Sequence, residues 1–484
     1  MYIHLSLHYT VRNEKGCSYL IHRVGILNQT TNGFETLCMP PFMGYILAHI
    51  GDAPYEQSIA DISSRLGVSI QAVRHFVNQL TDNLECKNFV INDHLSINLP
   101  PALLCKSSDK VDVKIWEADD LNFETDFTLK RPEMPISVNL MATTQCTTDC
   151  IYCYADRSLH PVMETSKVLE LISELHDEGV VNITLTGGDV FARKDWKTIL
   201  KSMRDLEYFP YISTKTPVSP DDILFLKSLG YNEIQFSLDS HSETILKGMV
   251  NAPENYLQKV VDFLRAAGEN NFKILIRSVV TKQNADINQI TGFYNFLSAF
   301  DAVKEWAITP AFFSPYKADH YKNLQVNNDD LKDIYAFSKR DDLKFPILLN
   351  KISDKGYRLK STESVEDYVV ANQICMANTT ALSILANGRC SLCEMLYEAD
   401  EYILGDVRKS SVRDIWNSNK ALGLYHLKQA AIDKDSACAS CTVFEQCRNA
   451  YGKRVCYVDI RKTGKSLSCP DPRCPMAEDY NLIF

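Results

Sequence analysis

Apolar residues are spaced in several different ways along this chain, and each spacing predicts a different kind of structure. Near the N-terminus, two apolar, β-rich segments at 2–10 and 17–24 flank the polar turn 13–16 and predict a hairpin. Apolar residues then recur at helical intervals, which predicts three short helices at 41–50, 55–66 and 69–84. From about residue 134 strand patterns alternate with amphipathic helical ones, and beyond residue 375 long periodic segments become rare.

The N-terminal pattern, strands followed by three short helices, resembles a winged helix-turn-helix. We therefore expect residues 1–105 to form a winged-helix-like α+β domain. A DNA reader is one alternative for such a domain. The formal net charge of the chain is −10, whereas a protein that binds duplex nucleic acid is normally basic. The charge therefore argues against a nucleic-acid partner.

The central region has the pattern of a parallel α/β sheet. Polar and acidic residues at 106–133 predict a linker in front of it. Successive apolar segments are then separated by enough residues for a right-handed crossover helix. The predicted strands are 136–142, 181–186, 211–214, 233–238, 273–280 and 305–309. We expect residues 134–340 to form a partial (βα)6 barrel, and residues 341–374 to form a charged connection.

Cysteine content changes the picture of the C-terminal part. The chain has 16 cysteines, of which four are scattered through the first 105 residues, three lie between 146 and 153, and nine lie between 375 and 474. Disulfide frameworks are not usually segregated in this way, whereas metal ligands are. Residues 375–484 are expected to need bound metal in order to fold. Because the sequence has neither a run of about 20 apolar residues nor an export signal, we expect a cytoplasmic protein with no membrane partner.

The three clustered cysteines, Cys146, Cys150 and Cys153, follow the first predicted barrel strand with the spacing C-x3-C-x2-C. A [4Fe–4S] cluster normally takes four cysteines, so three would leave one iron open to another ligand. A zinc loop is the alternative, but zinc usually takes four protein ligands as two separated pairs. The motif, with Tyr152 before its last cysteine, resembles that of the radical S-adenosylmethionine (SAM) superfamily. That resemblance implies that the open iron binds SAM and that reductive cleavage of SAM releases a 5′-deoxyadenosyl radical.

Polar residues at the ends of later strands fit the same superfamily, because ligands of parallel sheets bind at the carboxyl ends of the strands. Gly187, Gly188 and Asp189 resemble a Gly-Gly-Glu element that holds the SAM ammonium group, with aspartate as a departure. The sequence Ser213-Thr214-Lys215 stands where the family often has Ser-Thr-Asn. With Tyr152, the residues that the resemblance implies as further SAM contacts are Ser213, Ser237, Asp239, Lys247 and Arg277.

The C-terminal cysteines resemble a SPASM domain, which carries auxiliary iron–sulfur clusters. Their order is Cys375-x12-Gly388-x4-Cys393, then Cys438-x2-Cys441-x5-Cys447-x8-Cys456, then Cys469-x4-Cys474. The x8 spacing, where x3 is usual, and the additional Cys390 and Cys469 depart from the family pattern. Two fully ligated [4Fe–4S] clusters need eight cysteines, and nine are present. Two zinc sites built from the same cysteines are the alternative.

The SPASM resemblance also implies how these cysteines are shared between two clusters. The first would use Cys375, Cys393 and Cys456, with Cys390 as the candidate fourth ligand. The second would use Cys438, Cys441, Cys447 and Cys474, with Cys469 either spare or replacing one of them. Glu394 directly follows Cys393, where sulfatase-maturing relatives have a proton-accepting carboxylate, so it is a candidate base.

Together, the three domains resemble enzymes that mature ribosomally synthesised peptides. In that family the first domain is similar to the small peptide chaperone of the pyrroloquinoline quinone pathway and binds the leader of a precursor peptide as an added strand. Leader docking would raise the local concentration of the core peptide near the radical. We therefore expect an oxidative cross-link, a thioether, carbon–carbon or carbon–oxygen bond, in a precursor peptide.

The cofactors expected from these resemblances are SAM and three [4Fe–4S] clusters, with an electron donor such as a flavodoxin or ferredoxin as a partner. Two alternative functions stay open at this point. One is formylglycine formation, as in sulfatase-maturing enzymes. The other is a winged-helix regulator that is stabilised by metal and has no enzymatic activity.

Overall fold

The computed structural model describes residues 1–23, 36–92, 95–119, 121–123, 130–158, 161–354, 364–371, 375–397 and 399–478. Several predicted segments lie partly outside these ranges: Val24 of the second strand, 120 and 124–129 of the linker, 355–363 and 372–374 of the connection, and 479–484 of the C-terminal domain. The chain divides into two compact units. The first comprises Met1–Ser137, Glu174–Ile183 and Tyr208–Pro210, and the second comprises Val138–Ser173, Thr184–Glu207 and Tyr211–Phe484.

The described strands of the first unit are β1 (Tyr2–Leu5), β2 (Tyr9–Glu14), β3 (Cys17–His22), β4 (Thr36–Met39), β5 (Lys87–Asn92), β6 (Leu95–Leu99), β7 (Leu104–Ser107) and β8 (Ile115–Glu117). A four-stranded sheet has the order β4-β3-β2-β8. The predicted hairpin is present, because Glu14 pairs with Cys17 where β2 turns into β3. The linker prediction is wrong for part of 106–133, since β8 lies within this segment and pairs in parallel with β2.

Three helices of the first unit lie where the sequence predicts them: α1 (Pro41–His49), α2 (Tyr55–Leu66) and α3 (Ile70–Leu80). Gly67 ends α2 with a φ of +66°, a conformation that favours glycine. The side chain of Ser69 caps α3 by accepting a hydrogen bond from the backbone N–H of Ala72. Helix α3 ends four residues before the predicted end, because Thr81 is extended and Asp82 has a φ of +55°. Three helices followed by the β5–β6 hairpin have the element order of a winged helix.

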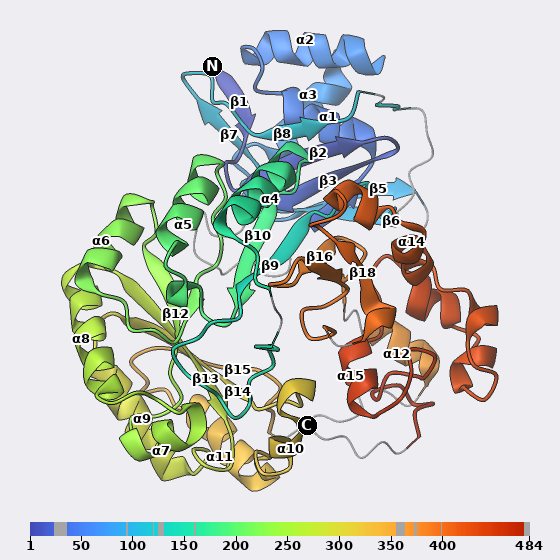
Figure 1. Cartoon of the computed structure of the whole chain (residues 1–484). Coiled ribbons are helices and arrows are strands. Elements are labelled where there is room, and N and C mark those ends of the chain that lie inside the picture. Colours follow the sequence, from blue (N-terminus) through green and yellow to red (C-terminus); the bar gives the residue numbers. More distant parts are fainter. Residues whose placement is uncertain are drawn as a thin grey trace. The chain divides into compact units, whose positions relative to one another are not determined.

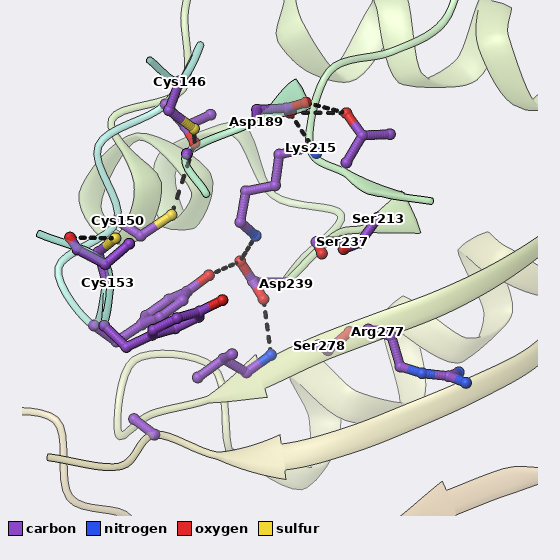
Figure 2. Close-up of a pocket in the computed structure, with 18 of the residues that line it drawn as sticks. Cys146, Cys150, Cys153, Asp189, Ser213, Lys215, Ser237, Asp239, Arg277 and Ser278 are labelled. Atoms are coloured by element: carbon purple, nitrogen blue, oxygen red, sulfur yellow. Dashed lines mark hydrogen bonds and ion pairs between the residues drawn. The ribbon is translucent and has the colours of Figure 1, made fainter. Parts of the chain in front are cut away.

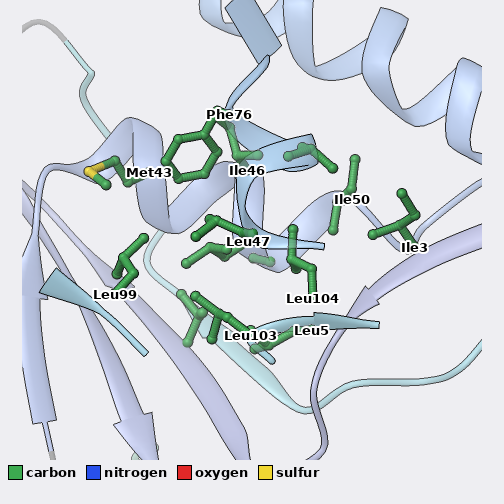
Figure 3. Packing of buried hydrophobic residues seen from close by; sticks show 14 of the residues in the cluster. Ile3, Leu5, Met43, Ile46, Leu47, Ile50, Phe76, Leu99, Leu103 and Leu104 are labelled. Carbon is green, nitrogen blue, oxygen red and sulfur yellow. The ribbon is translucent and has the colours of Figure 1, made fainter. Parts of the chain in front are cut away.

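One apolar core holds the first unit together. Helix α3 buries Val73, Phe76, Val77 and Leu80, which recur at helical spacing. Figure 3 shows side chains of α1 and α3 packed together with Leu103 and Leu104. Burial of such side chains is the main stabilising term of a small domain.

The described barrel strands are β9 (Ser137–Thr143), β10 (Asn182–Gly187), β11 (Ser213–Thr214), β12 (Glu233–Ser237), β13 (Lys273–Val280), β14 (Val303–Pro310) and β15 (Ile347–Leu349). All six predicted strands are present. Strand β15 lies in the segment 341–374 that was predicted as a connection, and it pairs in parallel with β14. The (βα)6 expectation therefore omits one strand, which is only three residues long and carries too little pattern to be recognised.

Helices alternate with these strands, as expected for parallel connections. The helices described after β9 and before the C-terminal region are α4 (Thr165–Asp177), α5 (Trp196–Asp205), α6 (Pro220–Ser228), α7 (Glu243–Val250), α8 (Tyr256–Glu269), α9 (Ile287–Ser298), α10 (Ala318–Tyr321), α11 (Asn328–Ser338) and α12 (Val365–Ala371). Figure 1 shows α6, α8 and α9 along the outer side of strands β12 and β13. Strands β11 to β15 form one sheet in sequence order.

The C-terminal region adds strands to the other half of the barrel. Strands β16 (Ala381–Ile384), β17 (Arg389–Ser391) and β18 (Ile403–Asp406) extend the pair β9 and β10 into a sheet of order β10-β9-β16-β17-β18. Gly388, with a φ of +82°, makes the turn between β16 and β17. The helices described beyond this sheet are α13 (Val412–Trp416), α14 (Asn419–Tyr425) and α15 (Tyr457–Lys462). In the described part of the chain, no helix combines the length and the apolar character needed to span a bilayer.

A buried ion pair lies at the centre of the first unit. Arg12 on β2 is fully buried, and its Nη2 lies 2.7 Å from Oε1 of Glu14. Its Nη1 donates to the carbonyl oxygens of Gly179 and Pro135, at 3.3 and 3.4 Å. Burial raises the pKa of Glu14, and the neighbouring Arg12 opposes that rise. The two charges therefore depend on each other.

Substituting Arg12→Met is expected to destabilise the first unit by about 3–5 kcal/mol, because it leaves the Glu14 carboxylate buried without its partner. Urea denaturation followed by tryptophan fluorescence measures the change. Arg74→Met is the matched control, since it breaks the exposed Arg74–Glu56 pair, which is 2.7 Å long. An exposed pair contributes little, so equal shifts of the two variants would contradict the assignment.

Candidate functional site

One cavity of about 270 Å³ lies where the carboxyl ends of strands β9 to β14 meet. Figure 2 shows that side chains from several of these strand ends point toward it. Among the predicted site residues, those that line it are Cys146, Cys150, Tyr152, Cys153, Gly187, Gly188, Asp189, Ser213, Ser237, Asp239 and Arg277. The sheet therefore brings together residues that are up to 131 positions apart in the sequence, from Cys146 to Arg277.

The cysteine loop is held by its own backbone and by helix α7. The N–H groups of Asp149 and Ile151 donate to the last carbonyls of α7, on Val250 and Met249, each at 2.9 Å. The hydroxyl of Thr148 lies 3.4 Å from Sγ of Cys146 and 3.7 Å from Sγ of Cys150. Two of the three sulfurs are thus gathered around one side chain, beside the cavity that all three cysteines line.

The three cysteines line one cavity with the spacing that an iron–sulfur cluster can use. Among the described residues, no three or more Cys, His, Asp or Glu side chains are grouped so as to hold one metal ion. A four-iron cube is larger than one ion and keeps its cysteine ligands further apart. Burial raises the pKa of Cys153 to about 11, so this thiol needs a cation such as iron to become a thiolate ligand.

The two glycines of the β10 turn are required by a close backbone contact. A Cβ atom on Gly187, whose φ is +135°, would lie 2.2 Å from the carbonyl oxygen of Thr143. A Cβ atom on Gly188 would lie 1.9 Å from the carbonyl oxygen of Gln145. The N–H groups of Gly188 and Asp189 donate to these same carbonyls, at 2.8 and 2.6 Å. The glycines therefore join the β10 turn to the start of the cysteine loop.

The carboxylate of Asp189 forms hydrogen bonds within the protein. This carboxylate is buried and accepts hydrogen bonds from Thr214 Oγ1 and the N–H of Lys215, at 2.8 and 2.9 Å. It also accepts from Thr216 and from the N–H of Phe191. The side chain thus holds the loop after β11, while the residue itself lines the cavity together with Gly187 and Gly188.

A charged network that the sequence prediction missed lies beside the cysteines. Lys215 Nζ is 2.8 Å from Oδ2 of Asp239, and the hydroxyl of Tyr152 donates to the same oxygen. The N–H of Val279 donates to the other carboxylate oxygen at 2.8 Å. Burial alone would lower the pKa of Lys215, but Asp239 and the thiolate of Cys150 outweigh this and raise it. The only sequence signal was a lysine at a strand end where the family often has asparagine.

Two predicted residues lie differently from the expectation. Lys247 is exposed on α7 and does not line the cavity, so the geometry is against its expected role as a SAM contact. Arg277 lines the cavity, but its Nη1 lies 2.6 Å from Oε1 of Glu305, so its charge already has a carboxylate partner. Both residues were predicted from position relative to strands, which does not determine the direction of a long side chain.

Glu394 is outside the lining of the cavity and is connected to it through another side chain. Its Oε2 accepts a hydrogen bond from Thr186 Oγ1 at 2.8 Å. Tyr154 lines the cavity, and burial together with the charge of Glu394 raises the pKa of its hydroxyl, so the two side chains interact. Burial raises the pKa of Glu394. Tyr154 follows Cys153 directly and was not predicted, since nothing in its sequence position distinguishes it from a core aromatic.

A second, smaller cavity contains the four cysteines expected at one auxiliary cluster. Cys438, Cys441, Cys447 and Cys474 line it together with mainly apolar residues of the same region. Arg448 Nη2 lies 3.5 Å from Sγ of Cys438. Cys469 does not line this cavity. Four cysteines that line one cavity match the number of ligands of a fully ligated cluster.

The cysteines expected at the other auxiliary cluster also influence one another. Burial raises the pKa of Cys393 to about 12, and the charge of Cys375 adds to this rise. Cys375 similarly raises the pKa of Cys456, after burial. Cys390 is fully buried on β17, in register with Ile384 and Gly405. A cluster would supply the positive charge that these buried sulfurs require as thiolates.

Comparison with known families decides between the metal chemistries. The model of the radical SAM superfamily matches residues 140–290, and that of the SPASM iron–sulfur cluster-binding domain matches residues 375–442. This chain is a radical SAM enzyme with a SPASM domain. Its cofactors are therefore SAM, a SAM-binding [4Fe–4S] cluster and auxiliary iron–sulfur clusters.

Several characterised proteins are similar to this radical SAM enzyme. A GTP 3′,8-cyclase of Lactiplantibacillus plantarum is 24% identical over 274 residues, which is 53% of this chain and 78% of that protein. The sporulation killing factor maturation protein SkfB of Bacillus subtilis is 21% identical over 299 residues, 60% of this chain and 67% of SkfB. The crystal structure of Streptococcus suis SuiB bound to precursor peptide SuiA covers 98% of this chain and 99% of SuiB, with a TM-score of 0.63 and 14% identity. At this identity, SuiB shows a shared fold.

Substituting Gly188→Ala is expected to remove the SAM-binding cluster, because the added Cβ would displace the backbone of Gln145 at the start of the cysteine loop. Iron should fall from about twelve to about eight atoms per chain, as expected for the loss of one of three four-iron clusters. Iron analysis and absorbance near 400 nm after anaerobic purification measure this. Gly248→Ala is the matched control, since a Cβ there meets open space. Full iron content in the Gly188→Ala protein would contradict the close contact.

Proposed function

We propose that this radical SAM enzyme modifies a ribosomally synthesised precursor peptide by oxidative cross-linking. The observation that carries the proposal is the fold shared with SuiB. The similarity covers 98% of this chain, and so includes all three regions, and SuiB was solved with its precursor peptide. The similarity to SkfB, a maturation protein of a killing factor, supports the same class of substrate. The bond formed is a thioether, a carbon–carbon bond or a carbon–oxygen bond.

The N-terminal unit is the proposed binding site for the leader of the peptide. Strand β4 ends the described sheet β4-β3-β2-β8 and is paired on one side, with β3. An edge strand offers backbone N–H and C=O groups to an extended peptide, which can add to the sheet as a further strand. A leader held in this way keeps the attached core peptide at high local concentration.

The residues that line the cavity bind the cofactors, orient the reacting groups and shield the radical. When bound, SAM and the clusters supply a 5′-deoxyadenosyl radical and an acceptor for the surplus electron. Cys146, Cys150 and Cys153 line the cavity at the strand ends and would hold the SAM-binding cluster there. A radical generated in this cavity must be kept from water to avoid side reactions. Each cross-link removes two hydrogens from the peptide, one as an atom and one as a proton and an electron. An external donor such as a flavodoxin or ferredoxin supplies the electron that starts each turnover.

Glu394 is the proposed acceptor of the proton. Its side chain is half-buried, and it interacts with Tyr154, which lines the cavity. A carboxylate whose pKa is raised by desolvation is a suitable base near neutral pH. Thr186 holds the other side of the group in place.

Co-expression with the short peptide encoded beside the gene is expected to lower the mass of the peptide by two hydrogens per linkage. Cys146→Ala is the matched control and should give the unmodified mass, because the radical chemistry needs this ligand. Tandem mass spectrometry locates the bond as a segment that resists fragmentation. A peptide that loses two hydrogens and reacts with a hydrazide probe would instead contain an aldehyde, which favours formylglycine formation.

Cys441→Ala is expected to separate radical formation from peptide modification. Cys441 lines the second cavity, which is distinct from the cavity that holds the three-cysteine loop. Cleavage of SAM to 5′-deoxyadenosine should therefore continue, while formation of the cross-linked peptide falls at least about tenfold, which is a barrier change of about 1.4 kcal/mol. Chromatography of both products measures the ratio. Unchanged cross-linking would show that the four-cysteine cavity has no part in turnover.

A further inference from the structure

We propose that Lys215 is the charge-compensating residue of the SAM-binding cluster and that its ammonium group raises the reduction potential of that cluster. The family resemblance supplies no such role, because asparagine often stands at this position. The inference concerns the radical SAM centre and does not depend on the identity of the peptide substrate.

The backbone of Lys215 is fixed on both sides. Its N–H donates to the carboxylate of Asp189 at 2.9 Å, and the same carboxylate holds Thr214 and Thr216. The hydroxyl of Tyr256 donates to the carbonyl oxygen of Lys215 at 2.7 Å. Because the backbone is fixed, the side chain of Lys215 starts from a defined position. Little further conformational entropy is lost in holding its charge there.

The ammonium group lies beside the cysteine loop and is largely shielded from solvent. The side chain of Lys215 is 13% exposed, and that of its partner Asp239 is 1% exposed. Lys215 Nζ lies 5.7 Å from the centre of the Tyr152 ring, which belongs to the cysteine loop. Figure 2 shows the side chain extended from the loop after β11 toward Asp239, beside Cys150. Its charge interacts with the sulfur of Cys150, one of the three cluster ligands.

Asp239 pairs with Lys215, and its carboxylate is also held by two neutral donors. The hydroxyl of Tyr152 donates to the oxygen that also contacts Lys215, and the N–H of Val279 donates to the other oxygen. The Lys215–Asp239 pair is formally neutral, so its effect on a nearby group depends on which of the two charges dominates there. Burial raises the pKa of the Cys150 thiol, and Lys215 lowers it by more than Asp239 raises it, so the ammonium charge dominates at this cysteine.

The two other cations that line the cavity are less suited to this role. Arg277 has Glu305 within 2.6 Å and, in Figure 2, extends away from the cysteine loop. The side chain of Arg157 is 25% exposed and pairs with the half-exposed Asp149 at 3.3 Å, so solvent and salt screen its field. Lys215 combines burial with proximity to a cluster ligand.

A charge count gives the direction of the effect. A [4Fe–4S]²⁺ core with three thiolates carries a net charge of −1, and reduction makes it −2. A fixed cation in a medium of low dielectric constant stabilises the more negative state more strongly. Lys215 therefore favours reduction of the cluster, and a neutral side chain at this position makes the cluster harder to reduce.

The test measures the reduction potential of the SAM-binding cluster in the full holoenzyme. The cluster is identified as the one whose electron paramagnetic resonance spectrum changes when SAM is added, and it is titrated in the wild type and in four variants. Lys215→Met should shift the midpoint potential to a more negative value, and Lys215→Arg should stay near the wild type. Asp239→Asn should shift it in the opposite direction, because the ammonium charge then has less opposition. Lys201→Met, which removes a 62% exposed lysine on α5, is the surface control and should cause no shift.

Three results would overturn the proposal. The first is an unchanged potential in Lys215→Met at full iron content. The second is an unchanged potential with weakened SAM binding in Lys215→Met, which would mean that Lys215 holds SAM instead. The third result concerns the case in which Lys215→Met fails to bind iron. The potentials of Lys215→Arg and Asp239→Asn are then compared, and equal potentials in these two variants contradict a charge effect. Absence of any SAM-dependent signal in the wild type would instead contradict the radical SAM assignment itself.

Discussion

Two backbone hydrogen bonds between the β10 turn and the start of the cysteine loop are the constraint on which the site depends. Gly188 and Asp189 donate to carbonyls of Thr143 and Gln145, and the contact is so close that neither glycine has room for a Cβ atom. The same turn places the Asp189 carboxylate where it can hold the loop after β11. One small turn thus connects three successive strand ends around a single cavity.

Charge inside that cavity is distributed over a few buried groups. The carboxylate of Asp189 accepts hydrogen bonds from the loop after β11. The carboxylate of Asp239 is shared between Lys215, Tyr152 and the N–H of Val279. Arg277 is paired with Glu305. The protein's own hydrogen bonds therefore fix the positions of these groups, which suits a reaction through a radical, since a poorly held radical reacts with its surroundings.

The SPASM region is joined to the barrel by a shared sheet. Strand β16 pairs with β9, the strand that leads into the cysteine loop, and β17 and β18 follow in the same sheet. The segment that carries Cys390 and Cys393 therefore belongs to the sheet of the barrel. Tyr154 and Glu394 extend this connection through side chains, from the residue after Cys153 to the residue after Cys393. Two sets of cysteines that are more than 200 residues apart in the sequence are thus built on one framework.

The sequence by itself determined which chemistry the chain can perform and where most strands lie. Cysteine spacing indicated iron–sulfur chemistry because several thiolates at short intervals can surround one cluster, and alternating strand and helix patterns identified β9 to β14 because burial imposes periodicity. Only the tertiary structure decided the directions of long side chains. It paired Arg277 with Glu305, left Lys247 on the surface, and brought Lys215 to Asp239. These outcomes depend on partners 24 or more residues away in sequence, and local spacing contains no record of them.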